Sequence, residues 1–185
     1  LEESDRYTRG HSERVSQYAE LIGRKLTLND KNIELLVWAA LMHDIGKIGI
    51  RNEKLNKPGK LTPEELAMFR THPAKGKRIL EPIPFMADLI PGALCHHEAW
   101  DGNGYPGALM GENIPLIGRI VAIADSYDAM TSDRSYRKAM PHEIAMSEID
   151  RCSGSQYDER LVEVFQAAIE EHRAKEISAG NEVLR

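Results

Sequence analysis

The stretch Trp38-Ala-Ala-Leu-Met-His-Asp-Ile-Gly-Lys47 is the most informative part of this chain. It places a histidine, His43, and a carboxylate, Asp44, side by side at the end of an apolar run. Such groups are costly to bury unless something pairs with them. A metal ion is a suitable partner, because imidazole and carboxylate together bind divalent first-row metals. The stretch therefore predicts a helix that brings His43 and Asp44 to a metal site.

The rest of the chain supplies more ligands of the same types. The separations are 32 residues (11 to 43), 28 (44 to 72), 24 (72 to 96) and 28 (97 to 125), each about one helix plus one connection. Successive helices would therefore pass a common centre, which five of the seven histidines can join. Neighbouring residues on a helix point about 100° apart, so Asp44 could bridge two metals. The further candidate ligands are His11, His72, His96, His97 and Asp125.

The apolar spacing predicts an all-α fold without a β-hairpin. Thr62 and Glu65 form a capping-box pattern that starts a helix at Pro63, and Pro73 is expected to bend or restart that helix beside His72. Residues 51–60 and 101–115 are rich in turn residues and are expected to be loops. The remaining helices are predicted over residues 8–27, 31–47, 86–98, 116–131, 141–152 and 158–173.

The length and the net charge limit the number of domains and the kinds of binding partner. The 185 residues predict one domain, residues 1–174, followed by a frayed tail, residues 175–185. The net charge of −5 comes without a basic block, which argues against binding to duplex nucleic acid. An anionic substrate would need local cations instead.

The chain shows neither a long apolar run nor a signal peptide, so we expect a cytoplasmic segment without a membrane span. Its start without Met suggests a fragment of a longer protein. The two cysteines, Cys95 and Cys152, argue against a disulfide framework, and enough N and O ligands exist without Cys95.

Taken together, these motifs resemble the HD-GYP family of phosphohydrolases over roughly residues 5–170. A lone His-Asp pair would be weak evidence, whereas the whole ordered series is specific. The matching pieces are His11-Ser-Glu-Arg-Val15, His43-Asp-Ile-Gly-Lys47, Lys57-Pro-Gly-Lys-Leu-Thr62, His72-Pro-Ala-Lys-Gly76, His96-His-Glu98, Asp101-Gly-Asn-Gly-Tyr-Pro106, Arg119-Ile-Val-Ala-Ile-Ala-Asp125 and Asp128-Ala-Met-Thr-Ser-Asp-Arg-Ser-Tyr-Arg137.

The resemblance implies an HD-superfamily helical bundle with a Gly/Pro-rich loop, and hydrolysis of cyclic di-GMP to linear pGpG, with further cleavage to GMP left open. It also implies two divalent metals, iron or manganese first, that share and activate a bridging hydroxide. One metal would be held by His11, His43, Asp44 and Asp125, and the second by Asp44, His72, His96 and His97. Some members hold a third metal with a glutamate at the position that Tyr7 occupies here, so two are expected.

The resemblance further assigns catalysis to Asp44 and Lys47. It assigns substrate binding to Lys47, Asp128, Arg134 and Arg137. Each has a plainer interpretation: Lys47 could be a helix C-terminal cation, the arginines solvated surface charges, and Asp128 their structural partner. The family usually has proline where this chain has Ser135, which is expected to alter only local stiffness.

Gly104, Tyr105 and Pro106 would form a loop for substrate access or for contact with a partner, a diguanylate cyclase (GGDEF) domain. The plainer interpretation is a tight turn. An N-terminal regulatory domain outside this segment is also expected. Two other functions stay open: cleavage of another cyclic dinucleotide such as cyclic GMP-AMP, and a non-catalytic cyclic di-GMP sensor or docking module. His142 and His172 lack a motif and are interpreted as packed or surface residues.

Overall fold

The computed structural model describes residues 10–50, 62–133 and 138–183, and these ranges contain helices and no strand. The all-α prediction is therefore confirmed. Three 3-10 helices, η1 (Ile45–Gly49), η2 (Pro84–Leu89) and η3 (Gly111–Asn113), accompany the α-helices. The α-helices are α1 (His11–Lys25), α2 (Asp30–Met42), α4 (Pro63–Phe69), α5 (His72–Leu80), α6 (Ile90–Cys95), α7 (Leu116–Thr131), α8 (His142–Arg151) and α9 (Glu159–Val183).

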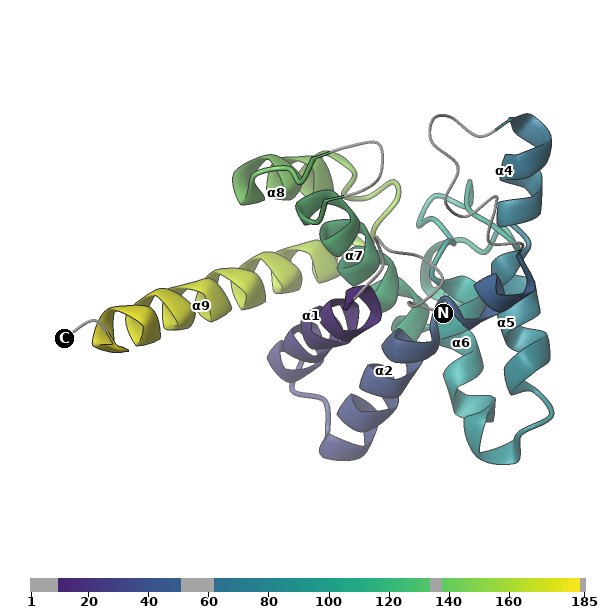
Figure 1. Ribbon diagram of the computed structural model, residues 1–185, viewed down its shortest axis with the longest axis horizontal. Coiled ribbons are helices and arrows are strands. Elements are labelled where there is room, and N and C mark those ends of the chain that lie inside the picture. Colours follow the sequence, from purple (N-terminus) through teal and green to yellow (C-terminus); the bar gives the residue numbers. More distant parts are fainter. Residues whose placement is uncertain (1–9, 51–61, 134–137, 184–185) are drawn as a thin grey trace.

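The main core lies where α1 packs against α2, α7 and the first half of α9 (Figure 1). It is built mainly from buried aliphatic side chains, together with the rings of Tyr127, Tyr157 and Phe165. Figure 1 shows α9 projecting away from this body toward the C-terminus. Burial of this apolar surface is the main driving force for bringing α1, α2 and α7 together.

A second, smaller core joins α2 to α5, η2 and α6 through Ala39, Leu80, Leu89 and Ala93. On that side of the molecule α6 also packs against α5 and α7, and α5 packs against η1. The two cores share α2, so the C-terminal end of α2 lies between them. That end carries His43 and Asp44.

The helix predicted over residues 31–47 is shorter than expected. It ends at Met42, His43 caps it, and the chain turns at Asp44 (φ −97°, ψ 7°) into η1. The prediction that His43 and Asp44 share one continuous α-helix is therefore wrong. The turn changes the direction in which the Asp44 carboxylate points relative to the rest of α2.

Two further helix boundaries differ from the prediction. The helix expected over residues 86–98 is divided into η2 and α6, with Pro91 in the first turn of α6, where a missing N–H costs nothing. The last helix continues past residue 173 to Val183, because its sequence is rich in good helix formers. The division into a domain and a tail at residue 174 stays a prediction.

Other predicted boundaries agree closely with the structure. Thr62 and Glu65 make the reciprocal capping box, α5 restarts at His72 before Pro73, and α7 has the predicted bounds. The predicted loop over 51–60 lies outside the described residues. None of the helices in the described ranges is long and apolar enough to cross a bilayer.

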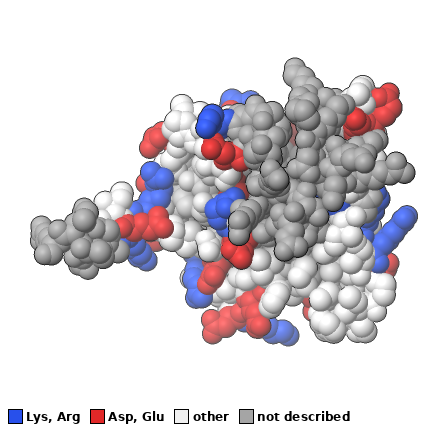
Figure 2. All heavy atoms as spheres, viewed as in Figure 1, with Lys and Arg blue, Asp and Glu red and all other residues white. Residues whose placement is uncertain are grey.

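Charged side chains of both signs are interspersed over the described part of the face in Figure 2, including the length of α9 that is visible there. This face therefore presents no single-sign patch. Local rather than global charge has to account for any binding of an anion.

Candidate metal centre

All seven predicted metal ligands converge where α1, α2, η1, α5, α6 and α7 meet. Three groups of ring nitrogens and carboxylate oxygens each lie within 4.8 Å of one another. These groups are His11, His43 and Asp125; His72, His96 and His97; and His43, Asp44 and His96.

Asp44 lies between the two histidine groups and presents a different oxygen to each. Its Oδ2 is 3.4 Å from His43 Nε2 and 3.9 Å from His11 Nε2, whereas its Oδ1 is 3.2 Å from His72 Nε2 and 3.9 Å from His96 Nε2. This is the arrangement that a bridging carboxylate needs. On the far side of the first group, Asp125 Oδ1 is 3.3 Å from His11 Nε2.

Backbone carbonyls orient three of the five histidines. The Nδ1 of His43 lies 2.6 Å from the Ala40 carbonyl, that of His72 2.8 Å from Phe69, and that of His96 3.0 Å from Gly92. Each carbonyl belongs to the preceding helical turn or its equivalent and accepts the Nδ1 proton. The lone pair is then left on Nε2, which points into the centre.

His11 is oriented by a carboxylate instead. Its Nδ1 lies 2.6 Å from Asp128 Oδ2, while Arg14 donates to both Asp128 oxygens at 2.5 and 3.1 Å. The Asp128 side chain is 1% exposed. The sequence motif predicts substrate contact for Asp128, whereas in this structure its oxygens face His11, Arg14 and Ser132. It is therefore a positioning group for His11.

Electrostatics favours ionised carboxylates in the centre. Burial opposes the charge on Asp44, but the Lys47 ammonium and the His43 imidazole hold the pKa of this carboxyl well below its usual range. Burial likewise opposes the charge on Asp125. The hydrogen bond from His11 and the positive charge of His43 outweigh burial and hold the pKa of Asp125 far below its usual range. Both aspartates are anionic at neutral pH.

The histidines of the centre differ in pKa. Burial lowers the pKa of His97 to about 4 and, with His97 and His43 nearby, holds the pKa of His96 well below its usual range. These two rings are neutral at neutral pH and could serve as ligands without losing a proton. Burial acts the same way on His11, but the carboxylates of Asp125 and Asp128 outweigh it and raise the pKa of His11 to about 9.

One buried atom points directly to a missing partner. His43 is fully buried, and its Nε2 has no hydrogen-bond partner in the described structure. An unpaired buried polar atom costs free energy, so a group that binds at this position is favoured. Imidazoles fixed with Nε2 inward, together with ionised carboxylates, form a donor set that fits divalent first-row cations, which would displace the protons of His11 and His43 on binding.

Gly46 fixes the position of Lys47. A Cβ at Gly46 would lie 1.9 Å from the backbone oxygen of His72, so only glycine lets η1 approach α5 this closely. Lys47 then places its ammonium 2.5 Å from Asp44 Oδ2 with its side chain 24% exposed. The predicted catalytic pair, Asp44 and Lys47, is thus brought together at the edge of the centre.

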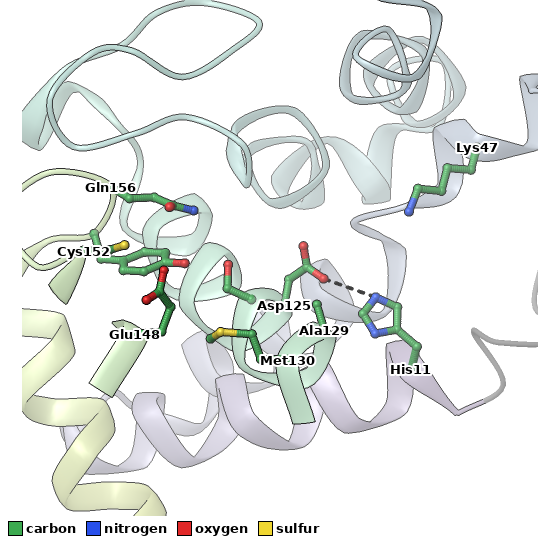
Figure 3. Close-up of a pocket in the computed structure, with 10 residues that line it drawn as sticks. His11, Lys47, Asp125, Ala129, Met130, Glu148, Cys152 and Gln156 are labelled. Carbon is green, nitrogen blue, oxygen red and sulfur yellow. Dashed lines mark ion pairs between the residues drawn. The ribbon is translucent and has the colours of Figure 1, made fainter. Parts of the chain in front are cut away.

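The centre opens into a cavity of about 440 Å³ (Figure 3). In the close-up, His11 and Lys47 lie on one side and Glu148, Cys152 and Gln156 on the other, with Asp125 between them. A second cavity, of about 490 Å³, is lined by His97 and Tyr105. The two cavities share Asp125 and Gln156, so open space adjoins the centre in two directions.

The Gly104-Tyr105-Pro106 loop lies against this second cavity. The Tyr105 ring stacks on His97 with ring centroids 4.8 Å apart, and Arg70 lies 5.2 Å from the Tyr105 centroid. The Tyr105–Pro106 peptide is cis. The predicted loop therefore does reach the metal centre through its tyrosine, while Pro106 is exposed.

Several residues have roles that sequence reasoning missed or left open. Arg14 and Glu98 were quoted in motifs but given no function, and the carbonyls that orient the histidines have no side-chain signal. Cys95 is buried and belongs to none of the candidate ligand groups. His142 bridges Tyr127 and Glu170, in line with a packed residue. Arg134, Ser135, Arg137 and Tyr7 lie outside the described residues.

The chain matches known proteins along most of its length. A family model described as HD domain matches residues 1–161. A cyclic di-GMP phosphodiesterase from Thermotoga maritima is 44% identical over 87% of this chain and 44% of its own length. A 3'3'-cGAMP-specific phosphodiesterase 3 from Vibrio cholerae is 44% identical over 76% of this chain and 31% of its own length.

A solved HDG"Y"P protein from Bdellovibrio bacteriovorus has the same fold, with a TM-score of 0.70 at 21% identity over 86% of this chain and 51% of its own. The chain spans less than half the length of the two curated relatives. The matched family model and the ordered series of histidines and aspartates agree with each other: the chain belongs to the HD domain family.

Proposed function

We propose that this chain is the catalytic domain of a metal-dependent cyclic di-GMP phosphodiesterase, which opens the cyclic dinucleotide to linear pGpG. The observation that carries the proposal is Asp44, which presents one oxygen to each of two histidine groups at the edge of an open cavity. The names of the relatives supply the substrate class. Whether a second cut yields GMP is left to experiment.

The centre is proposed to hold two divalent cations, iron or manganese. His11, His43, Asp44 and Asp125 would hold one, and Asp44, His72, His96 and His97 the other. Cations bound in this way lower the pKa of water and offset the negative charge of a phosphodiester. Since the donors are nitrogen and oxygen only, availability as well as affinity decides which metal binds.

The chain's own residues prepare the substrate. The Lys47 ammonium lines the cavity beside Asp44 and can donate to a phosphate oxygen as negative charge develops there. Asp128 keeps His11 in the orientation that points Nε2 inward, and backbone carbonyls do the same for His43, His72 and His96. The two cavities on either side of Asp125 give a cyclic dinucleotide room for both of its halves. Arg134 and Arg137 are proposed to contact substrate on the strength of the sequence motif alone.

Product analysis tests this function. Protein reconstituted anaerobically with ferrous iron or manganese is incubated with cyclic di-GMP, and products are separated by chromatography. Linear pGpG or GMP from the wild type, and none from Asp44→Ala with the same helical content, is the expected result. Wild-type protein that contains about two metals per chain and yields no product would contradict the proposal.

Cyclic GMP-AMP is the second candidate substrate. The observation that favours it is the 44% identity with the Vibrio cholerae 3'3'-cGAMP-specific enzyme. Competition between cyclic di-GMP and cyclic GMP-AMP in the same assay separates the two. A metal-loaded protein that binds cyclic di-GMP without cleaving it would instead indicate the sensor role.

We also propose a partner domain and a regulatory domain for this chain. The tip of the loop, residues 106–108, is exposed and is the surface that we propose for contact with a diguanylate cyclase (GGDEF) domain. A regulatory domain is proposed to precede this segment in the whole protein. Copurification of a GGDEF domain with the wild type, and loss of that contact in Pro106→Ala, would support the first of these proposals.

A further inference from the structure

The ring of His97 is held differently from the other four histidines of the metal centre. Carbonyls or Asp128 accept a hydrogen bond from the Nδ1 of His11, His43, His72 and His96. Within the described ranges, no residue hydrogen-bonds the His97 ring. A ligand without such a partner needs another means of orientation, because partners of this kind fix the ring and tune its affinity for metal.

Stacking is the contact that the structure provides instead. The Tyr105 ring lies nearly parallel to His97, with 4.8 Å between centroids and an interplanar angle of 25°. His72 contacts the same imidazole edge-on, with centroids 4.9 Å apart, and His96 lies tilted against it, with centroids 4.1 Å apart. Of these three neighbouring rings only Tyr105 belongs to the loop, so the position of the loop contributes to the orientation of His97.

The loop is pressed against the segment that carries His97. The Tyr105 N–H donates to the His97 carbonyl at 3.0 Å. A Cβ at Gly104 would lie 2.2 Å from the backbone nitrogen of Ala99, so glycine is required for this close approach. The hydrogen bond and the close backbone contact together fix the start of the loop relative to His97.

Glu98 fixes the other end of the loop. Its side chain is buried, at 4% exposure, and accepts hydrogen bonds from the Gly107 N–H at 2.6 Å and the Leu109 N–H at 2.9 Å. Hydrogen bonds from backbone N–H groups to a buried carboxylate are among the strong ones. One carboxylate, next to His97 in the chain, therefore closes the loop from Tyr105 to Leu109 over that histidine.

We propose that Glu98 is a positioning residue that clamps the loop so that Tyr105 sets the orientation of His97 toward a bound divalent cation. This inference rests on the metal centre of the proposed function. It gives the inner face of the Gly-Tyr-Pro loop a role in metal binding, separate from any role of its exposed tip.

Titration of metal-free protein with cobalt(II) tests the clamp, since both affinity and the visible absorption of the bound ion can be read. His97→Ala identifies the binding step that depends on His97. In Glu98→Gln, which replaces one acceptor oxygen by an NH2 group, that step should weaken by at least about tenfold. Glu112→Gln, a surface glutamate after the same loop, should stay within about twofold of the wild type and serves as the control.

A second pair of variants separates stacking from folding defects. Tyr105→Phe keeps the ring and should keep the affinity, whereas Tyr105→Ala should weaken the same step by about tenfold. If Glu98→Gln loses its helical circular dichroism, and therefore its fold, the two Tyr105 variants still test whether stacking on His97 affects metal binding. Wild-type affinity and an unchanged cobalt spectrum in both Glu98→Gln and Tyr105→Ala would overturn the inference alone. Wild-type protein that binds no cobalt would overturn the proposed metal centre and the inference with it.

Discussion

Lys47 is the side chain that connects the proposed metal centre with the cavity. Its ammonium lies 2.5 Å from Asp44 Oδ2, and its side chain is 24% exposed on the cavity wall. A helix C-terminal cation, the plainer interpretation of its sequence position, would not have to approach a buried carboxylate. The contact favours a role at the reaction centre.

Replacing Lys47 by Met tests that role. We expect kcat to fall by about 10²–10³, the range found when a donor to developing charge is removed, with metal content unchanged. Steady-state kinetics on cyclic di-GMP with metal analysis of the same sample checks this. Retention of full kcat in Lys47→Met would leave Lys47 as a structural partner of Asp44.

His11 gives the metal-free protein a distinctive dependence on pH. Because Asp125 and Asp128 raise the pKa of His11 to about 9, against about 6.5 in an unfolded chain, the folded state binds its proton more tightly. That stabilisation is complete below pH 6.5 and is lost as the pH rises through 9. The full shift corresponds to a free energy of unfolding on the order of 3 kcal/mol.

We therefore expect metal-free protein in a chelator to unfold at lower urea concentration at pH 9 than at pH 6.5. His11→Asn should flatten this slope, and Asp128→Asn should reduce it because one of the two carboxylates that raise the pKa is gone. Equilibrium urea denaturation followed by circular dichroism measures both. A wild-type stability that is constant or rises over this interval would contradict the assignment.

At the scale of elements, the turn at Asp44, between α2 and η1, decides the geometry of the centre. The end of α2 at Met42, the turn at Asp44 and the close approach of η1 to α5 together bring Asp44 within 3.2 Å of His72. Gly46 permits that approach, since a side chain there would meet the backbone of His72.

Gly46→Ala should consequently separate η1 from α5. We expect it to destabilise the protein by about 3 kcal/mol or more, at the upper end of the range for inserting a methyl group into packed structure. Gly154→Ala is the control: nothing lies within 4 Å of its Cβ, and only its positive φ costs about 1–2 kcal/mol. Thermal unfolding of the two variants compares them, and equal losses would refute the steric argument.

At the scale of the whole molecule, one buried aspartate joins three parts of the fold. Asp158, 3% exposed and just before α9, accepts from Arg119 of α7 at 2.7 Å and from Arg160 at 3.2 Å. Both guanidinium groups lie within 6 Å of the ring of Trp100, at the start of the loop over the metal centre. The packing of α9 is thereby connected to the position of that loop.

Asp158→Ala should cost about 3 kcal/mol, at the lower end of the range for breaking a buried ion pair, because it leaves the Arg119 charge, whose side chain is 14% exposed, without its partner. Removing the exposed partner of Arg160 by Glu112→Gln should cost less than about 1 kcal/mol. Urea denaturation gives both values. A loss below 1 kcal/mol for Asp158→Ala would show that the Arg119 cation is compensated by other groups.

The sequence by itself determined the local features of this protein. Side-chain types in the ordered series from His11 to Asp125 predicted which residues would converge, and hydrophobic period and capping patterns predicted the all-α fold, the α7 boundaries and the Thr62 capping box. These features could be predicted without knowing how the helices pack.

Only the tertiary structure decided how those residues are held. The inward nitrogen of four of the five imidazoles is set by a distant partner, Asp128 for His11, or by backbone carbonyls that carry no side-chain signal. Asp128 is buried because α1 and α7, far apart in the sequence, pack together. Glu98 holds the loop beside His97 because the chain folds back from Gly107 and Leu109 onto Glu98. Orientation is set by packing across the fold, and packing is not a property of any local stretch of sequence.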